Sequence, residues 1–200
     1  YPDGSTWQTL AGYINGEYQL KPNLSLLSGI RYSQVWVDAT FDPTYYPFPF
    51  DEADIVTGAL TGSLGLSWFP RSDLQVTLNG STGFRAPNID DIGKIFDSEP
   101  GSVVVPNPDL KAEYAYNAEL GAAWRIDEKL RLDVATYYTH FNNALVRRDF
   151  SLNGATTVDY QGEPSNVQAI QNAASAEVYG VEAGLEYLFT KNIKLTSQVT

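Results

Sequence analysis

The chain has 200 residues, a formal net charge of −11 and only 18% charged residues, together with 13 Tyr, 9 Phe and 4 Trp. The negative charge argues against a nucleic-acid partner, because a phosphate backbone requires a basic face. The sequence contains no cysteine, which excludes a disulfide framework and a thiolate metal site. No run of about 18 apolar residues is present to form a transmembrane helix. The first residues, 1–4, have the composition of a turn, so we expect the chain to be a piece of a longer protein.

A short polar turn recurs four times along the chain. Each turn follows an aromatic residue and precedes a Leu or Ile that opens an alternating polar and apolar run; the four segments are 18–29, 68–80, 124–138 and 187–200. The alternation has a period of two, which is typical of strands with one apolar face. The sequence therefore predicts four hairpins, or about eight antiparallel strands.

The other ends of these strands are joined by long connections. Residues 42–54, 85–117 and 147–175 contain no comparable alternation. Connections of this length are uncommon in compact soluble domains. The expected strand from Leu24 to Phe41 is also longer than the ~9–11 residues that cross a bilayer.

Two architectures are compatible with these strands. In a soluble β-sandwich the apolar face would form the core, whereas in a transmembrane β-barrel it would face lipid. The opposite face carries Gly, Ser, Thr, Asn, Gln, Glu and Arg, as a water-filled lumen requires. The short-turn end also carries aromatic residues of the kind found at membrane interfaces, namely Tyr18, Trp68, Phe69, Trp124 and Tyr187. These features favour the barrel.

Several motifs resemble the barrel of TonB-dependent outer-membrane receptors. The most specific are GFRAP (83–87) and NPDLKAE (107–113), followed by ELG (119–121) in a strand. YYTHFNNALVRR (137–148) and YGVEAGLEY (179–187) are similar to later strands of the family. The detailed sequence of these motifs resembles receptors of the Bacteroidetes type. Ala112 stands where the family usually has Pro, which leaves the assignment little changed.

The resemblance implies an all-β fold. We expect residues 1–200 to be about eight antiparallel strands of one large, monomeric barrel of about 22 strands, with short periplasmic turns and long extracellular loops. It further implies the outer membrane of a Gram-negative bacterium, contact with lipid, and TonB-driven uptake of a scarce nutrient: an iron-siderophore complex, haem, cobalamin or an oligosaccharide. The plug domain and its TonB-contacting segment are expected outside this chain.

Two loops supply candidate ligand contacts. The first loop, residues 42–54, has four acids, no base and the aromatic residues Tyr45, Tyr46, Phe48 and Phe50, which either stack on a ligand or pack on neighbouring loops. In the second loop, Asp90 and Asp91 either help to hold a ligand or a divalent cation or form a solvated surface. In the latter case Asn88 or Asp90 caps a short helix through Ile89, Ile92 and Phe96.

Arg85 and Pro87 stand where a predicted strand ends. Proline cannot donate to a strand ladder, so the strand is expected to stop there. We expect Arg85 to be a structural arginine that pairs with Glu113 or Glu119 on the adjoining strand, rather than a ligand contact.

No enzyme motif accompanies these strands. His140 is the single histidine, and neither a serine motif, a phosphate loop nor a zinc spacing occurs with it. We therefore expect a transport protein without a cofactor or metal site. The alternatives are a passive porin or small adhesin-like barrel and, from another class, a soluble β-rich glycan-binding module.

Overall fold

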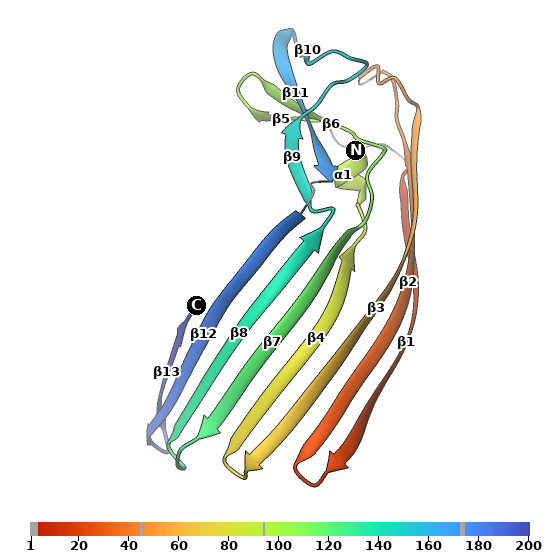
Figure 1. Cartoon of the computed structure of the whole chain (residues 1–200). Coiled ribbons are helices and arrows are strands. Elements are labelled where there is room, and N and C mark those ends of the chain that lie inside the picture. The colour runs from red at the N-terminus through yellow and green to blue at the C-terminus, as the bar shows by residue number, and fades with distance from the viewer. Residues whose placement is uncertain (1–3, 45, 94, 173–174) are drawn as a thin grey trace.

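A computed structural model describes residues 4–44, 46–93, 95–172 and 175–200, so Tyr45 lies outside the described residues. Its main element is an eight-stranded sheet in the order β1-β2-β3-β4-β7-β8-β12-β13 (Figure 1). The strands of this sheet are β1 (Thr6–Lys21), β2 (Leu24–Thr40), β3 (Glu52–Arg71), β4 (Leu74–Arg85), β7 (Glu113–Arg125), β8 (Leu130–Asn142), β12 (Ser175–Thr190) and β13 (Ile193–Val199). This confirms the eight predicted strands.

Every neighbouring pair in the main sheet is antiparallel, and four short turns join strands at one end. Polar residues close these turns. In the turn between β7 and β8, for example, the Asp127 carboxylate accepts hydrogen bonds from the backbone N–H groups of Lys129 at 2.7 Å and Leu130 at 2.8 Å. Asp commonly folds back on its own turn in this way, which is why a short polar segment is sufficient to reverse the chain.

The two faces of the main sheet differ in polarity. Directly paired residues of antiparallel strands point to the same face, so the register divides the side chains into two sets. One set, the outer face, includes Ile14, Leu10 and Leu60, whose exposed fractions are 76%, 68% and 63%. An exposed apolar face extending over eight strands is incompatible with water. It is the lipid-facing surface of a barrel wall, and the other set is the inner face.

The inner face becomes apolar toward the long-loop end. Val35, Val37 and Ala39 on β2, and Ala53 and Ile55 on β3, are at most 6% exposed. They form one cluster with Phe41, Ile92 and Leu110, which lie in or next to the long connections. The upper inner face of β2 and β3 therefore holds a second layer of chain, whose strands the sequence did not predict.

That second layer is a small sheet built from two long connections. It has the strand order β10-β11-β6-β5, and β9 pairs with β11 beside β10. Its elements are β5 (Phe96–Glu99), β6 (Ser102–Val105), β9 (Leu145–Asp149), β10 (Thr157–Tyr160) and β11 (Glu163–Asn172), and the helix α1 (Ile89–Gly93) precedes it. We call these elements, together with loop 42–54, the cap. Figure 1 shows the cap above the ends of β7, β8 and β12, beside the taller β1, β2 and β3.

One detail of the connections differs from the sequence prediction. The helix α1 ends at Gly93, so Phe96 is not part of it and lies in β5 instead. The helix lies on the inner rim of the wall, because Ile92 is fully buried in the cluster with Val35 and Val37. No helix among the described segments is long and apolar enough to span a membrane.

Candidate functional site

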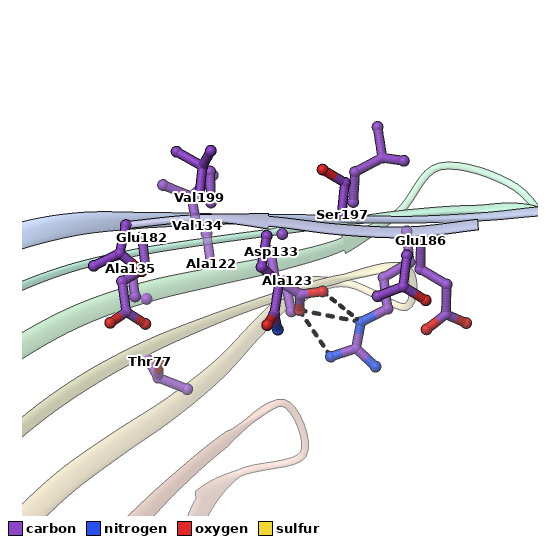
Figure 2. Close-up of a pocket in the computed structure, with 18 of the residues that line it drawn as sticks. Thr77, Ala122, Ala123, Asp133, Val134, Ala135, Glu182, Glu186, Ser197 and Val199 are labelled. Atoms are coloured by element: carbon purple, nitrogen blue, oxygen red, sulfur yellow. Dashed lines mark hydrogen bonds and ion pairs between the residues drawn. The ribbon is translucent and has the colours of Figure 1, made fainter.

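The lower inner face of the wall carries an acidic concavity of about 720 Å³ across β4, β7, β8, β12 and β13. Figure 2 shows Thr77, Asp133, Glu182 and Glu186 on one side of the sheet, whereas Val134 and Val199 project from the other side. This division follows from the alternation of side chains along each strand. The concavity therefore belongs to the lumen and not to the lipid-facing surface.

Carboxylates outnumber basic groups in this concavity. Arg131 Nη2 lies 2.8 Å from Asp133 Oδ1, and Lys194 Nζ lies 2.8 Å from Glu186 Oε2. Among the residues that the structure describes, Glu119 and Glu182 form no ion pair. The wall thus presents surplus negative charge to the lumen, where it can attract cationic groups of whatever occupies the barrel.

Arg85 and Asp91 form an ion pair at the point where β4 leaves the wall. Arg85 Nη2 lies 3.0 Å from Asp91 Oδ2 and 3.1 Å from Oδ1. The expected pairing of Arg85 with Glu113 or Glu119 is therefore wrong. Although Glu113 is the direct strand partner of Arg85, its carboxylate instead accepts the backbone N–H of Leu145 at 2.8 Å, and Glu119 lies in the lumenal concavity.

Asp91 and Asn88 together cap the N-terminus of α1. The Asn88 side-chain oxygen accepts the Asp91 N–H at 2.9 Å, and the Asp91 carboxylate accepts the Asn88 N–H at 3.1 Å. This reciprocal arrangement is a capping box, which confirms Asn88 as the cap. Pro87 is buried and Asp90 is exposed. Throughout the described ranges, no three His, Cys, Asp or Glu side chains gather in a manner that could hold a metal.

The described aromatic residues of the first loop pack within the cap. The Phe48 and Phe50 rings stack at a centroid distance of 5.5 Å, and Phe41 contacts both rings edge-on at 5.4 and 5.2 Å. Phe48 and Phe50 pack against both the wall cluster and the core of the small sheet. They therefore join the cap to the wall.

Tyr46 is half-buried beside the same aromatic residues. Its ring lies 4.9 Å from Phe48 and 6.3 Å from Tyr160. Burial, with a further contribution from the charge of Asp159, raises the pKa of the Tyr46 phenol above its ordinary value. Both effects favour the neutral phenol within the cap.

The two faces of the small sheet differ in polarity at β11. Val103, Val167 and Ala169 are at most 1% exposed and pack toward Phe48 and Phe50. Asn166 and Gln168 alternate with the buried residues along β11, and so project from the opposite face. Ile170 lies on the same face as Asn166 and Gln168 and packs against the wall cluster, so the polar part of this face is confined to the Asn166 end of β11.

A groove of about 740 Å³ lies beside Asn166 and Gln168. Its lining includes Glu99, Asp149, Thr156, Asn166 and Gln168, and none of these residues was identified from the sequence. The available signal was the segment Ser165–Ala169, in which buried and polar residues alternate as in a half-covered strand.

The predicted interface aromatics lie together near the short turns. Tyr18, Trp68, Phe69 and Trp124 have exposed fractions of 67%, 46%, 43% and 38%, and Tyr187 is half-buried against Phe189. Trp124 Nε1 donates a hydrogen bond of 3.0 Å to Asp73 in the turn between β3 and β4. A ring in the apolar zone with its N–H at the polar boundary is the arrangement expected at a membrane interface.

Comparison with known proteins places this wall and cap in one family. The profile of the family described as "TonB dependent receptor-like, beta-barrel" matches residues 1–200. The chain belongs to this family, and it lies in the outer membrane of a Gram-negative bacterium. This confirms the resemblance seen in the motifs of the sequence.

The chain is similar to two curated proteins. It is 33% identical over 118 residues to the hemoglobin-haptoglobin utilization protein B of Neisseria meningitidis serogroup A / serotype 4A. The aligned residues cover 56% of this chain and 14% of that protein. It is 31% identical over 117 residues to the hemoglobin and hemoglobin-haptoglobin-binding protein B of Haemophilus influenzae, covering 54% of this chain and 11% of that protein. The Bacteroidetes resemblance is not confirmed by these relatives.

Solved structures share the fold at lower identity. The hemophore receptor HasR of Serratia marcescens, solved with its hemophore HasA and heme, superposes with a TM-score of 0.73 at 17% identity, over 97% of this chain and 34% of that chain. The ferric yersiniabactin uptake receptor FyuA of Yersinia pestis gives a TM-score of 0.60 at 21% identity, over 94% and 25% of the two chains.

Proposed function

We propose that this chain forms part of the wall and extracellular cap of a receptor that captures a scarce nutrient and imports it with energy supplied through TonB. The observation that supports this function is the cap, which is anchored to the upper inner face of the wall above a polar, acidic lumen. A polar surface held over the mouth of a conduit is suited to capturing a ligand before import. Transport of this kind requires no chemistry from the chain.

The full receptor would contain the parts that this chain does not supply. The chain spans 14% of the first matched relative. We therefore propose that a plug, the remaining strands and the TonB contact are supplied by the rest of the receptor. The surplus carboxylates of Glu119 and Glu182 would face the plug across the lumen. A monomeric barrel, with lipid around its outer face, completes this arrangement.

The names of the similar proteins favour an iron or haem source among the nutrients. Two relatives are named for haemoglobin-haptoglobin, one structure contains a hemophore with heme, and another is a ferric siderophore receptor. Cobalamin and oligosaccharide remain further substrate classes for this proposal. The family membership disfavours a soluble module. A passive porin is the alternative that the experiment must distinguish from an energy-coupled receptor.

Growth experiments separate an energy-coupled receptor from a passive porin. The full receptor would be expressed in an iron-starved strain lacking its own receptors, with haemoglobin, free haem or a ferric siderophore as the iron source. We expect growth on at least one source in the presence of TonB and no growth after deletion of TonB. Equal growth with and without TonB would overturn energy-coupled uptake in favour of diffusion.

A further inference from the structure

The wall strands β7 and β12 are linked by a side chain where they meet the cap, although β8 lies between them in the main sheet. The link is the amide of Asn172, at the end of β11, which hydrogen-bonds to the backbone of Lys111 just before β7. Asn172 Nδ2 donates to the Lys111 carbonyl at 2.9 Å, and Asn172 Oδ1 accepts the Lys111 N–H at 2.9 Å. The side-chain amide thus takes the place that a peptide group would have in a neighbouring strand.

The same amide also holds the chain where it leaves β8. Asn172 Nδ2 donates a second hydrogen bond, of 2.8 Å, to the carbonyl of Asn143. Asn143 directly follows β8 and has a φ of 56°, a left-handed conformation that Asn adopts more readily than most residues. Both donor hydrogens and the acceptor oxygen of Asn172 are therefore used. One side chain fixes the chain at the ends of β7, β8 and β11 together.

Two other residues of the segment 107–113 strengthen this link. Asn107, which is 7% exposed, donates from Nδ2 to the Ile170 carbonyl at 2.8 Å. The Glu113 carboxylate accepts the Leu145 N–H at 2.8 Å. The segment therefore contacts both the first and the last residues of the connection between β8 and β12. We call the following residues the polar clamp: Asn107, Lys111, Glu113, Asn143, Leu145, Ile170 and Asn172.

The polar clamp attaches the cap to the wall at a different place from the aromatic rings. Phe48 and Phe50 hold the cap against β2 and β3, and apolar contact of this kind has no preferred direction. Hydrogen bonds do have one. Leu145 and Asn172 are register partners at the wall end of the β9–β11 pair, and Figure 1 shows β9 above the ends of β8 and β12. The clamp is therefore placed to set the direction in which this pair leaves the wall.

We propose that Asn172 is a positioning residue for nutrient capture, because its amide fixes β9 and β11 relative to the wall and so sets where the cap lies over the lumen. The fixing of the cap follows from the hydrogen bonds, whereas its importance for capture rests on the proposed function. A cap that occupied its binding position for only part of the time would lower the apparent affinity by that fraction.

Two replacements of Asn172 separate its hydrogen bonds from its bulk. Asn172→Asp keeps the shape and one acceptor, but its carboxylate faces the carbonyls of Lys111 and Asn143 without a donor. Protonation in acid returns one donor, so acid should restore this variant in part. Asn172→Ala removes the amide at every pH. Asn166→Asp is the matched control, because it adds the same charge at an exposed position of β11. Lys111→Met is a second control, since only the backbone of Lys111 contacts Asn172.

Electron–electron double resonance on the purified full receptor measures the position of the cap. Spin labels are attached at Glu163→Cys in the cap and Val181→Cys on the outer face of β12, where both side chains are exposed. The chain has no cysteine of its own. At about pH 8 we expect narrow distances in the unchanged receptor and both controls, and a roughly twofold broader distribution in both Asn172 variants. At about pH 4, near the ordinary pKa of an aspartic acid, only Asn172→Asp should narrow.

Growth with and without TonB measures capture, with whichever of haemoglobin, free haem or a ferric siderophore the unchanged receptor uses. Both Asn172 variants should still require TonB. The concentration of iron source that gives half-maximal growth should rise roughly five- to tenfold, as expected if the cap keeps its position for about a tenth to a fifth of the time. Asn166→Asp and Lys111→Met should grow as the unchanged receptor does.

Three results would overturn the positioning role. They are an unchanged distance distribution in Asn172→Ala, a broadened distribution in Asn172→Asp that acid does not narrow, and broadened distances with an unchanged half-maximal concentration. Absence of both variants from the outer membrane would assign Asn172 to folding instead. All of these results leave energy-coupled uptake standing while growth of the unchanged receptor requires TonB. Conversely, TonB-independent growth would remove the proposed function without altering the measured position of the cap.

Discussion

Arg85 and Asp91 are joined through both carboxylate oxygens, at 3.1 and 3.0 Å from Arg85 Nη2, at the boundary between the wall and the cap. The Asp91 side chain is 11% exposed and that of Arg85 is 48% exposed. The same Asp91 carboxylate accepts the Asn88 N–H. One acidic side chain thus fixes the last residue of β4 and the first turn of α1 to each other.

Replacement of Asp91 should loosen the start of the cap. Asp91→Ala removes the ion pair and half of the capping box, and we expect a local loss of about 1–2 kcal/mol. Hydrogen exchange at residues 88–93 of the purified receptor should accelerate by about tenfold. Asp90→Ala is the control, since Asp90 is exposed in the same turn; equal acceleration in both variants would contradict the role given to Asp91.

Phe50 should be more important for the cap than its half-buried position suggests. Its ring contacts Phe41 and Phe48 and touches the clusters of both layers. Phe50→Ala should cost about 2–4 kcal/mol, somewhat less than for a fully buried ring. The expected result is faster proteolysis at the hairpin of residues 150–156, with the strands of the wall unaffected.

The adjacent Pro49 gives a matched control for this variant, because it is exposed. Pro49→Ala should leave the proteolysis rate close to that of the unchanged receptor. If both variants were cleaved at the same rate, the stacked rings would not be the link between cap and wall.

Gly180 should tolerate no side chain without movement of Tyr137. A Cβ atom at Gly180 would lie 2.7 Å from the Tyr137 hydroxyl oxygen and 2.9 Å from Cζ, whereas at Gly184 the nearest atom would be Asp133 Cβ at 3.7 Å. We expect Gly180→Ala to cost about 1 kcal/mol through displacement of the Tyr137 ring.

The temperature at which the barrel loses its compact mobility in gel electrophoresis measures this effect. Gly180→Ala should lower that temperature, and Gly184→Ala in the same strand should not. A second variant, Gly180→Ala combined with Tyr137→Phe, should recover part of the loss, since the hydroxyl is the nearest atom; no recovery would assign the cost to the backbone.

Acid should release the contact between Asp73 and Trp124. The hydrogen bond from Trp124 Nε1, aided by Arg71 with Nε at 3.2 Å, lowers the pKa of Asp73 below its ordinary value of 3.8. A lowered pKa in the folded state contributes stability above the unfolded pKa, and this contribution is lost as the pH falls through the folded value.

Tryptophan fluorescence between about pH 5 and about pH 2 follows this change. We expect a transition whose midpoint lies below 3.8 and which is absent in Asp73→Asn. A transition of the same size and midpoint in Asp73→Asn would show that another group is responsible.

The eight wall strands could be predicted because their signal is local. Each strand alternates with a period of two, and each short turn contains its own polar residues. The strands of the cap carry no such signal at their full length. Ser102–Val105 is a short segment with three consecutive Val residues. It pairs in parallel with Asn166–Ala169, far along the chain, and no local pattern specifies that pairing.

The candidate site was predictable only in part for the same reason. The register placed Arg85 opposite Glu113 as the sequence suggested. However, the Glu113 carboxylate bonds the backbone of Leu145, and the capping turn brings Asp91 to Arg85 instead. The first-loop aromatics were visible as a cluster, but their contacts depended on a second sheet that the sequence did not reveal.

The construction of the cap from three connections has a consequence for how such receptors diverge. Loop 42–54 supplies the stacked rings, the second connection supplies β5 and β6, and the third supplies β9, β10 and β11. A change of length in one connection alone would leave buried positions of the other two uncovered. Grafting one loop onto a different barrel should therefore fail to transfer specificity, whereas the three connections exchanged together form a transplantable module.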